Sequence, residues 1–204
     1  AYFKKPKVIW TIIGIAAAVI IGVVCLTNPA GKPTNSTGTP IETSNMVKDL
    51  DYESIYEHKT LYAGNASKVG NLTDNLYYAE YRNGLSLNTK ARPYGININY
   101  IVKSGDSDGI KLTDKMLKNA AMMFCLIDNV DEINFKFDDG NKTYDFPFER
   151  EYFDEVFEED IRNYSVSFEK FRNEFIPMIE REFSDVGNKV EELLQVIMSS
   201  PKTS

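Results

Sequence analysis

The segment TDKMLKNAAMMFCLIDNVDEINFKFDDGNKTYDFPF, residues 113–148, contains the pattern of a helix followed directly by the pattern of a hairpin. Its first part, residues 113–128, is apolar on nearly every side of a helix, which is typical of a buried helix. In its second part, apolar and polar residues alternate on both sides of Asp139-Gly140-Asn141, whose residue types favour a tight turn. A buried helix beside a hairpin predicts a domain that mixes helices with a sheet.

Two more strands are expected upstream of this segment. Residues 85–90 (LSLNTK) and 96–102 (ININYIV) alternate apolar and polar side chains, which is typical of half-buried strands. Residues 92–95 (RPYG) lie between them and have the composition of a turn. The sequence therefore predicts an α+β fold, in which a small, mostly antiparallel sheet packs with helices.

Apolar spacing predicts further helices on both sides of the sheet segments. Ser67 precedes one of them and is expected to be its N-cap, while Pro177 is expected to kink another. These helices are expected at residues 52–58, 68–76, 149–157, 167–183 and 189–198.

The N-terminal part of the chain has the pattern of a membrane anchor. Residues 8–27 form a run of 20 residues without a charge, and a helix of that length spans roughly 30 Å, the thickness of the hydrocarbon core. Lys4, Lys5 and Lys7 precede the run, and no Lys or Arg follows it until Lys32. This asymmetry predicts a single-pass protein of the cell membrane, with a cytoplasmic N-terminus and an extracytoplasmic C-terminal part.

Composition then divides the chain into three parts. Residues 1–27 are the basic flank and the expected transmembrane helix, and residues 28–46 are rich in Pro, Gly, Ser and Thr, as flexible linkers are. Residues 47–200 are expected to form the extracytoplasmic α+β domain. The alternative is a lipoprotein leader in which Cys25 is lipidated, although Val24 fits poorly before such a cysteine.

The charge of the chain bears on its partners. The net charge is −7, and because the first 27 residues hold three lysines and no acidic residue, residues 28–204 carry −10. An acidic exterior disfavours nucleic acid, whose phosphates require a basic surface. Cys25 and Cys125 are expected to lie too far apart to form a disulfide, so the outer domain must be stabilised by its hydrophobic core.

The motifs that resemble catalytic sites have simpler structural interpretations. The chain has one histidine, His58, which leaves too few ligands for a zinc site built from side chains that zinc prefers. Residues 167–170 (SFEK) and 103–105 (KSG) resemble two elements of penicillin-recognising serine proteins, but they occur in the wrong order. The acidic residues 153–160 (FDEVFEED) are expected to form a solvated face. We therefore predict no catalytic residue, no metal ligand and no cofactor in this chain.

Four residues are candidates for binding a ligand. Arg92 and Tyr94 lie in the expected turn, Asn97 lies in the strand that follows, and Tyr77 belongs to a Tyr-Tyr pair. Each is a side chain often used for ligand contact at a surface. The alternative is that the tyrosines only cover the edge of the sheet.

The chain resembles known families in two places. The segment YFKKPKVIWTIIGIAAAVIIGVVCLTNP, residues 2–29, is similar to the last transmembrane helix of BlaR/MecR-type membrane metallopeptidases (peptidase family M56). Residues 55–172 resemble a bacterial domain of unknown function, number 4825, through three segments. These segments are YAGNASKVGNL (residues 62–72), RPYGININY (residues 92–100) and NAAMMFCLIDNVDEINF (residues 119–135).

The resemblance implies a sensor. In BlaR/MecR-type proteins an exterior domain detects an antibiotic, and a zinc protease then cleaves a repressor. Any zinc would therefore belong to a peptidase domain upstream of Ala1, and none of that family's functional residues lies in this chain. We expect a non-catalytic sensor or regulatory domain that binds an envelope ligand or protein.

Two alternatives remain open. One is a membrane-anchored binding module with no protease attached. The other is a hydrolase that uses a carboxylate pair from the acidic residues. The start of the chain, a basic flank without an initiator Met, favours the sensor.

Overall fold

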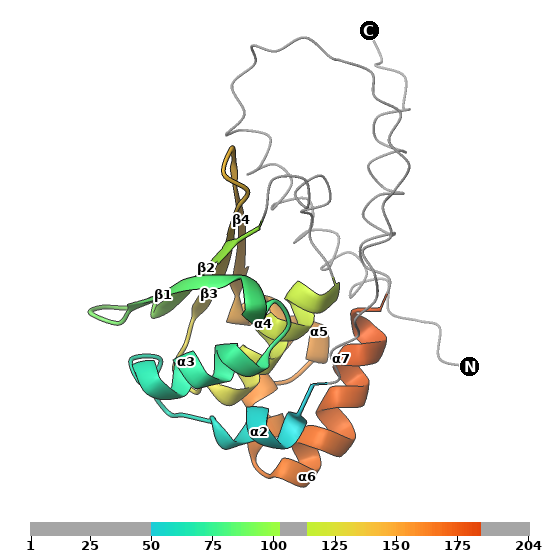
Figure 1. Cartoon of the computed structure of the whole chain (residues 1–204). Coiled ribbons are helices and arrows are strands. Elements are labelled where there is room, and N and C mark those ends of the chain that lie inside the picture. Colours follow the sequence, from blue (N-terminus) through green and yellow to red (C-terminus); the bar gives the residue numbers. More distant parts are fainter. Residues whose placement is uncertain (1–49, 103–113, 185–204) are drawn as a thin grey trace, which may run out of the picture.

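The computed structural model describes residues 50–102 and 114–184, which form one sheet covered by helices (Figure 1). Within these residues, none of the helices has the length and the apolar character needed to cross a bilayer. The expected span at 8–27, the linker at 28–46, the KSG segment and the helix at 189–198 lie outside the described residues.

Four strands form the sheet in the order β1-β2-β3-β4. They are β1 (Arg82–Asn88), β2 (Gly95–Ile101), β3 (Glu132–Asp138) and β4 (Thr143–Glu149). The hairpin predicted from the alternating aromatic residues is confirmed, because β3 pairs with β4 in antiparallel fashion and Phe135 lies opposite Phe146. The pair β1 and β2 is also antiparallel.

The central pair corrects the expectation of a mostly antiparallel sheet. Strands β2 and β3 run parallel, with Ile98 opposite Phe135, so the sheet is mixed. The reason is the connection between them, because a helix, α4 (Asp114–Leu126), returns the chain to the end where β2 began. The α+β class itself is confirmed.

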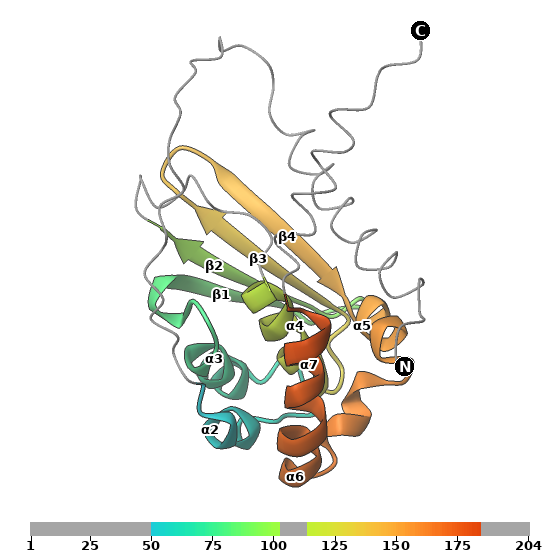
Figure 2. The ribbon, with the colours of Figure 1, turned by 90° about the vertical axis from the view of Figure 1, so that its right-hand side faces the viewer.

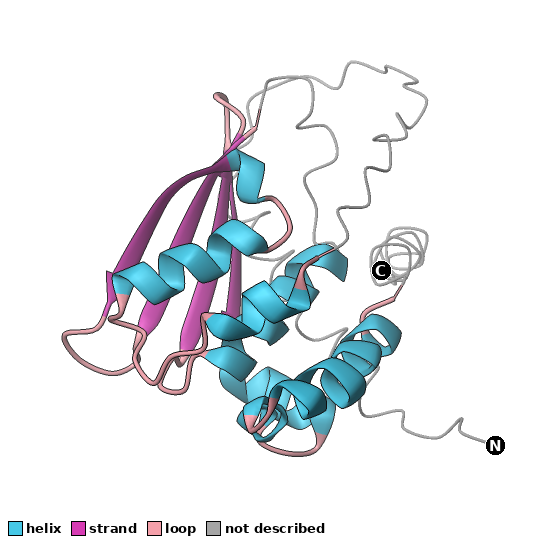
Figure 3. Cartoon of the chain, turned by 60° about the horizontal axis from the view of Figure 1, so that its bottom comes forward, coloured by secondary structure: helices cyan, strands magenta, loops and turns pink. Residues whose placement is uncertain are grey.

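The helices lie against one face of the sheet (Figures 2 and 3). Alternate residues of the strands point toward them. In β2 these residues, Ile96, Ile98 and Tyr100, are buried, whereas in the edge strand β1 they are only half-buried. The helical elements are α2 (Tyr52–Glu57), α3 (Ala66–Asn75), η1 (Ala79–Tyr81), α4, α5 (Arg150–Phe157), η3 (Ile161–Ser165), α6 (Phe168–Lys170), η4 (Phe171–Phe175) and α7 (Ile176–Glu182).

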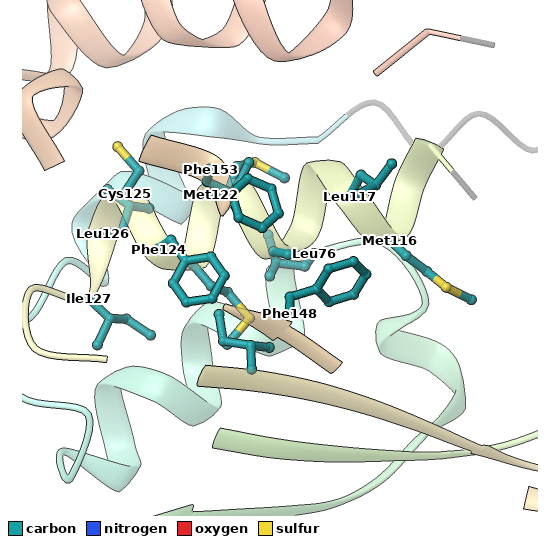
Figure 4. Close-up of a cluster of buried hydrophobic side chains, with 14 of the residues drawn as sticks. Leu76, Met116, Leu117, Met122, Phe124, Cys125, Leu126, Ile127, Phe148 and Phe153 are labelled. Carbon is teal, nitrogen blue, oxygen red and sulfur yellow. The ribbon is translucent and has the colours of Figure 1, made fainter. Parts of the chain in front are cut away.

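Helix α4 is the centre of the core. Every residue from Met116 to Leu126 is buried, as the apolar pattern of this segment predicts. The centre of the Phe124 ring lies 5.1 Å from that of Phe153, and Phe148 packs against Phe153 in turn (Figure 4). The helix therefore joins the sheet to α5 in one apolar cluster.

Two details of the helices differ from expectation. The N-cap of α3 is Asn65, whose Oδ1 accepts a hydrogen bond from the Lys68 amide at 3.2 Å, and Ser67 lies inside the helix. The run expected at 167–183 is helical from α6 to α7, but η4 is a π-helical turn that ends just before Pro177. The hydrogen-bonding pattern thus changes beside the residue that lacks an amide hydrogen.

Candidate functional site

Three loops meet at the end of the sheet where β2 and β3 begin, and we call this surface the loop end. It consists of residues 60–65 between α2 and α3, residues 89–94 between β1 and β2, and residues 127–131 between α4 and β3. Each loop contains part of one of the three segments that resemble domain 4825.

Hydrogen bonds hold the first loop to the third. The Thr60 amide donates to the Leu126 carbonyl, and the Asp128 amide donates to the Thr60 carbonyl, both at 3.0 Å. The Ala63 amide donates to Asn129 Oδ1 at 2.6 Å. Residues 60–63 therefore have a fixed backbone although they belong to a loop.

The turn at residues 89–94 is fixed to the third loop by Asp131. One carboxylate oxygen of Asp131 pairs with Arg92 at 2.7 Å, and the other accepts the Tyr94 amide at 2.7 Å. The Tyr94 carbonyl in turn accepts the Asp131 amide at 2.8 Å. The Arg92–Pro93 peptide bond in this turn is cis.

Arg150 forms hydrogen bonds with the backbone of the third loop. Its guanidinium donates hydrogen bonds to the carbonyls of Phe124, Ile127, Asp128 and Val130, at 2.6 to 3.1 Å. Burial lowers the pKa of this guanidinium. One half-buried guanidinium therefore joins the third loop to the last turn of α4.

The exposed side chains of the loop end are of two kinds. Leu61 and Tyr62 are 59% and 63% exposed, which is unusual for residues of their size in this domain. Arg92 is exposed as well, and its guanidinium lies 5.1 Å from the centre of the Tyr94 ring. The surface thus offers an aliphatic side chain, a phenol and a cation on a fixed backbone.

The four predicted binding residues do not form one site. Arg92 and Tyr94 lie together at the loop end, where Tyr94 is half-buried against the core. Asn97 lies on the face of β2 opposite to the helices, in register with Ser86 and Asn134.

Tyr77 lies at the other end of the sheet. Its amide and carbonyl pair with the side-chain amide of Asn119, at 3.1 and 2.9 Å. The next residue, Tyr78, packs against Tyr100 and Phe137 near the ends of β2 and β3. A seven-residue strand is about 23 Å long, so Tyr77 is too far from Arg92 to share a small ligand.

Sequence reasoning missed Leu61, Tyr62 and Asp131. The signal for the first two was present, since an apolar pair stands between two short helices, where polar residues are the rule. Asp131 gave no local signal because its role depends on contacts with a turn 37 residues away.

In the described part of the chain, the side chains that could be catalytic by residue type cap helices, contact rings or are buried. Ser167 is the N-cap of α6 and accepts the Lys170 amide at 3.1 Å, and the Lys170 ammonium lies 5.1 Å from the centre of the Tyr164 ring. Cys125 is buried, which raises the pKa of its thiol. His58 ends α2 and is half-buried.

The acidic residues at 153–160 are partly structural rather than a fully solvated face. Phe153, Val156 and Phe157 are buried, and Asp154 accepts the Ile161 amide at 2.8 Å. Asp160 pairs with Arg162. In the two described ranges, no group of three His, Cys, Asp or Glu residues is placed to hold a metal ion.

A comparison with protein families bears on the resemblance to domain 4825. Residues 55–148 match the family model described as a domain of unknown function (DUF4825). The match ends at β4, so it is shorter than the resemblance over residues 55–172, and it contains all three loops of the loop end. No match was found among curated proteins or among solved structures.

Proposed function

We propose that this chain is a non-catalytic, extracytoplasmic sensor or regulatory domain that binds an envelope peptide or protein through the loop end. The observation that carries the proposal is the exposure of Leu61 and Tyr62 on a backbone held by hydrogen bonds to the third loop. Apolar and aromatic side chains on a fixed backbone lose little conformational freedom on binding, so they are effective contact residues.

The mixed character of the surface favours a peptide or protein over a small polar ligand. Arg92 adds a cation on a second loop of the loop end, and its pairing with Asp131 orients it. Arginine and tyrosine are among the residue types that dominate the energetics of protein interfaces. The acidic charge of the chain disfavours nucleic acid as the partner.

The membrane context of the proposal comes from the sequence. Residues 8–27 would anchor the domain in the cell membrane of a bacterium, and the resemblance of residues 2–29 to the last span of BlaR/MecR-type proteins supports coupling to an upstream zinc metallopeptidase. The alternative is a stand-alone anchored binding module, or a lipoprotein, with no protease attached.

Cysteine labelling of intact cells tests the topology. Ser67→Cys places a thiol at an exposed position, and the buried Cys125 serves as the internal control. We expect a membrane-impermeant maleimide to label the Ser67→Cys variant before the cells are lysed. Labelling only after lysis would place the domain in the cytoplasm and remove the sensor from consideration.

The size of the native protein separates the two versions of the proposal. An antibody to the domain is used to blot membranes of the source organism, and the reactive protein is sequenced. A band well above 23.2 kDa with His-Glu-x-x-His upstream supports the protease-coupled sensor. A band near 23.2 kDa favours the stand-alone module.

Photo-crosslinking tests the binding surface itself. A photoreactive amino acid replaces Tyr62 in the full chain, and the same replacement at the exposed Thr143 of β4 is the control. We expect an adduct in native membranes at position 62 but not at 143, and Arg92→Glu should abolish it while the circular dichroism spectrum stays unchanged. Equal adducts at both positions would contradict a specific site at the loop end.

A further inference from the structure

The two edges of the sheet differ in how they are protected. Edge strands present unpaired N–H and C=O groups, and proteins usually block them with charges, proline or bulges. The β4 edge carries such devices, since Pro147 has no N–H and both Asp145 and Glu149 bring negative charge. A second strand would therefore pair poorly with β4.

The β1 edge lacks these devices over five residues. From Gly84 to Asn88 it contains no charge and no proline, and the bulge between Arg82 and Gly84 lies before this stretch. Apart from the pairing with β2, no backbone hydrogen bond reaches these five residues within the described part of the chain. Among the residues that the structure describes, nothing pairs with the outward N–H and C=O groups of this stretch.

The side chains of this edge also favour an added strand. Leu85 and Leu87 point toward the helices but are only half-buried, whereas their neighbours in β2, Ile98 and Ile96, are 0% and 1% exposed. A strand placed alongside β1 would cover both leucines. Ser86 points to the opposite face and is exposed.

We propose that residues 84–88 pair antiparallel with the same residues of a second copy of this chain, about a two-fold axis near Ser86. In this register Leu85 of each copy lies opposite Leu87 of the other, and the two Ser86 side chains face each other. The occupant is a second copy because the stretch is self-complementary, as an isologous interface requires. The chain carries −7 overall, so an uncharged edge is where two copies approach with least repulsion.

Disulfide trapping tests the pairing directly and does not depend on the proposed function. Directly opposite residues in antiparallel strands have Cβ atoms about 4.5–5.5 Å apart, close to the separation in a disulfide. Ser86→Cys is made in the full chain together with Cys25→Ser, and Thr143→Cys on the β4 edge is the control. We expect mild oxidation in membranes to give a covalent dimer at position 86 but not at 143. No dimer at 86, or equal yields at both positions, overturns the proposal.

A charge at the same position gives a second, independent measurement. Ser86→Lys places two ammonium groups opposite each other in the dimer, and Thr143→Lys puts the same charge on β4. In detergent solution we expect the wild type and Thr143→Lys to have the mass of two 23.2 kDa chains, and Ser86→Lys to have the mass of one. A wild-type chain with the mass of one copy, or a dimer that Ser86→Lys leaves intact, contradicts the pairing. Unchanged circular dichroism of both variants excludes misfolding.

Discussion

Arg150 gives the sharpest test of how the loop end is held. Its guanidinium donates to four carbonyls, at 2.7 Å to Phe124 and Ile127, at 2.6 Å to Val130 and at 3.1 Å to Asp128. The Phe124 carbonyl belongs to the last turn of α4, where carbonyls have no partner inside the helix. Arg150→Met removes these bonds and leaves the carbonyls without the cation.

The expected loss of stability is large. A hydrogen bond to a charged group contributes about 1.5–3 kcal/mol, and a buried carbonyl left without its donor costs about 1–3 kcal/mol. Because the four bonds share one guanidinium and are not additive, we expect Arg150→Met to lower the free energy of unfolding by about 3–5 kcal/mol. A domain typically has only about 5–15 kcal/mol in all, so this loss would be at least about a fifth of its stability.

Urea unfolding followed by circular dichroism measures this loss. Arg150→Lys keeps the charge but has a single ammonium that cannot reach all four carbonyls, so an intermediate loss of about 2 kcal/mol is expected. Arg172→Met, at an exposed arginine of η4, is the matched control and should change the free energy by no more than about 0.5 kcal/mol. If Arg150→Met also costs less than about 1 kcal/mol, the carbonyls are satisfied in another way and the supporting role of Arg150 is refuted.

Three further predictions concern single side chains. Asn65→Ala should cost about 1 kcal/mol in urea unfolding because it removes the N-cap of α3, and Ser67→Ala should cost almost nothing; the reverse order would restore Ser67 as the cap. Cys125 should resist a thiol reagent in the folded chain and react after addition of urea, because it is 1% exposed and burial raises the pKa of its thiol; rapid reaction before unfolding would contradict the packing of α4. Hydrogen bonds from Arg162 hold the pKa of Asp160 below its usual value, so its contribution to stability is present above about pH 4 and is lost as the pH falls further. Asp160→Asn should therefore flatten the stability profile below about pH 4, and an unchanged profile there would exclude this ion pair as a cause of acid unfolding.

Most secondary structure was predictable because it depends on local patterns. The period of two in β3 and β4 and the apolar circumference of α4 both survive in the structure, since burial on one face or on all faces fixes these patterns. The parallel pairing of β2 with β3 could also have been predicted from the sequence. A helix between two strands returns the chain to the end of the sheet where the first strand began, so the second strand runs parallel to the first. This argument outweighs the general preference of small sheets for antiparallel pairing.

The site was less predictable because its contacts are distant in sequence. The turn at 92–95 was recognisable, but nothing near it indicates that Asp131 orients Arg92 or that Asn129 holds the Ala63 amide. Tyr77 and Asn97 have suitable side chains, yet the strand geometry separates them from Arg92. Residue type identified candidates, and only topology shows which of them share a surface.

The same contacts link the stability of the domain to its proposed binding surface. Asp128 and Val130, whose carbonyls Arg150 binds, lie on either side of Asn129, which holds the loop that carries Tyr62. A ligand that contacts Tyr62 would therefore pull on a backbone connected to the end of α4 through two hydrogen-bonded steps. Because α4 is buried from Met116 to Leu126, such a displacement would be transmitted to the core rather than absorbed in a loose loop. This arrangement suits a domain that must report binding to a distant part of the chain better than one that only adheres to a partner.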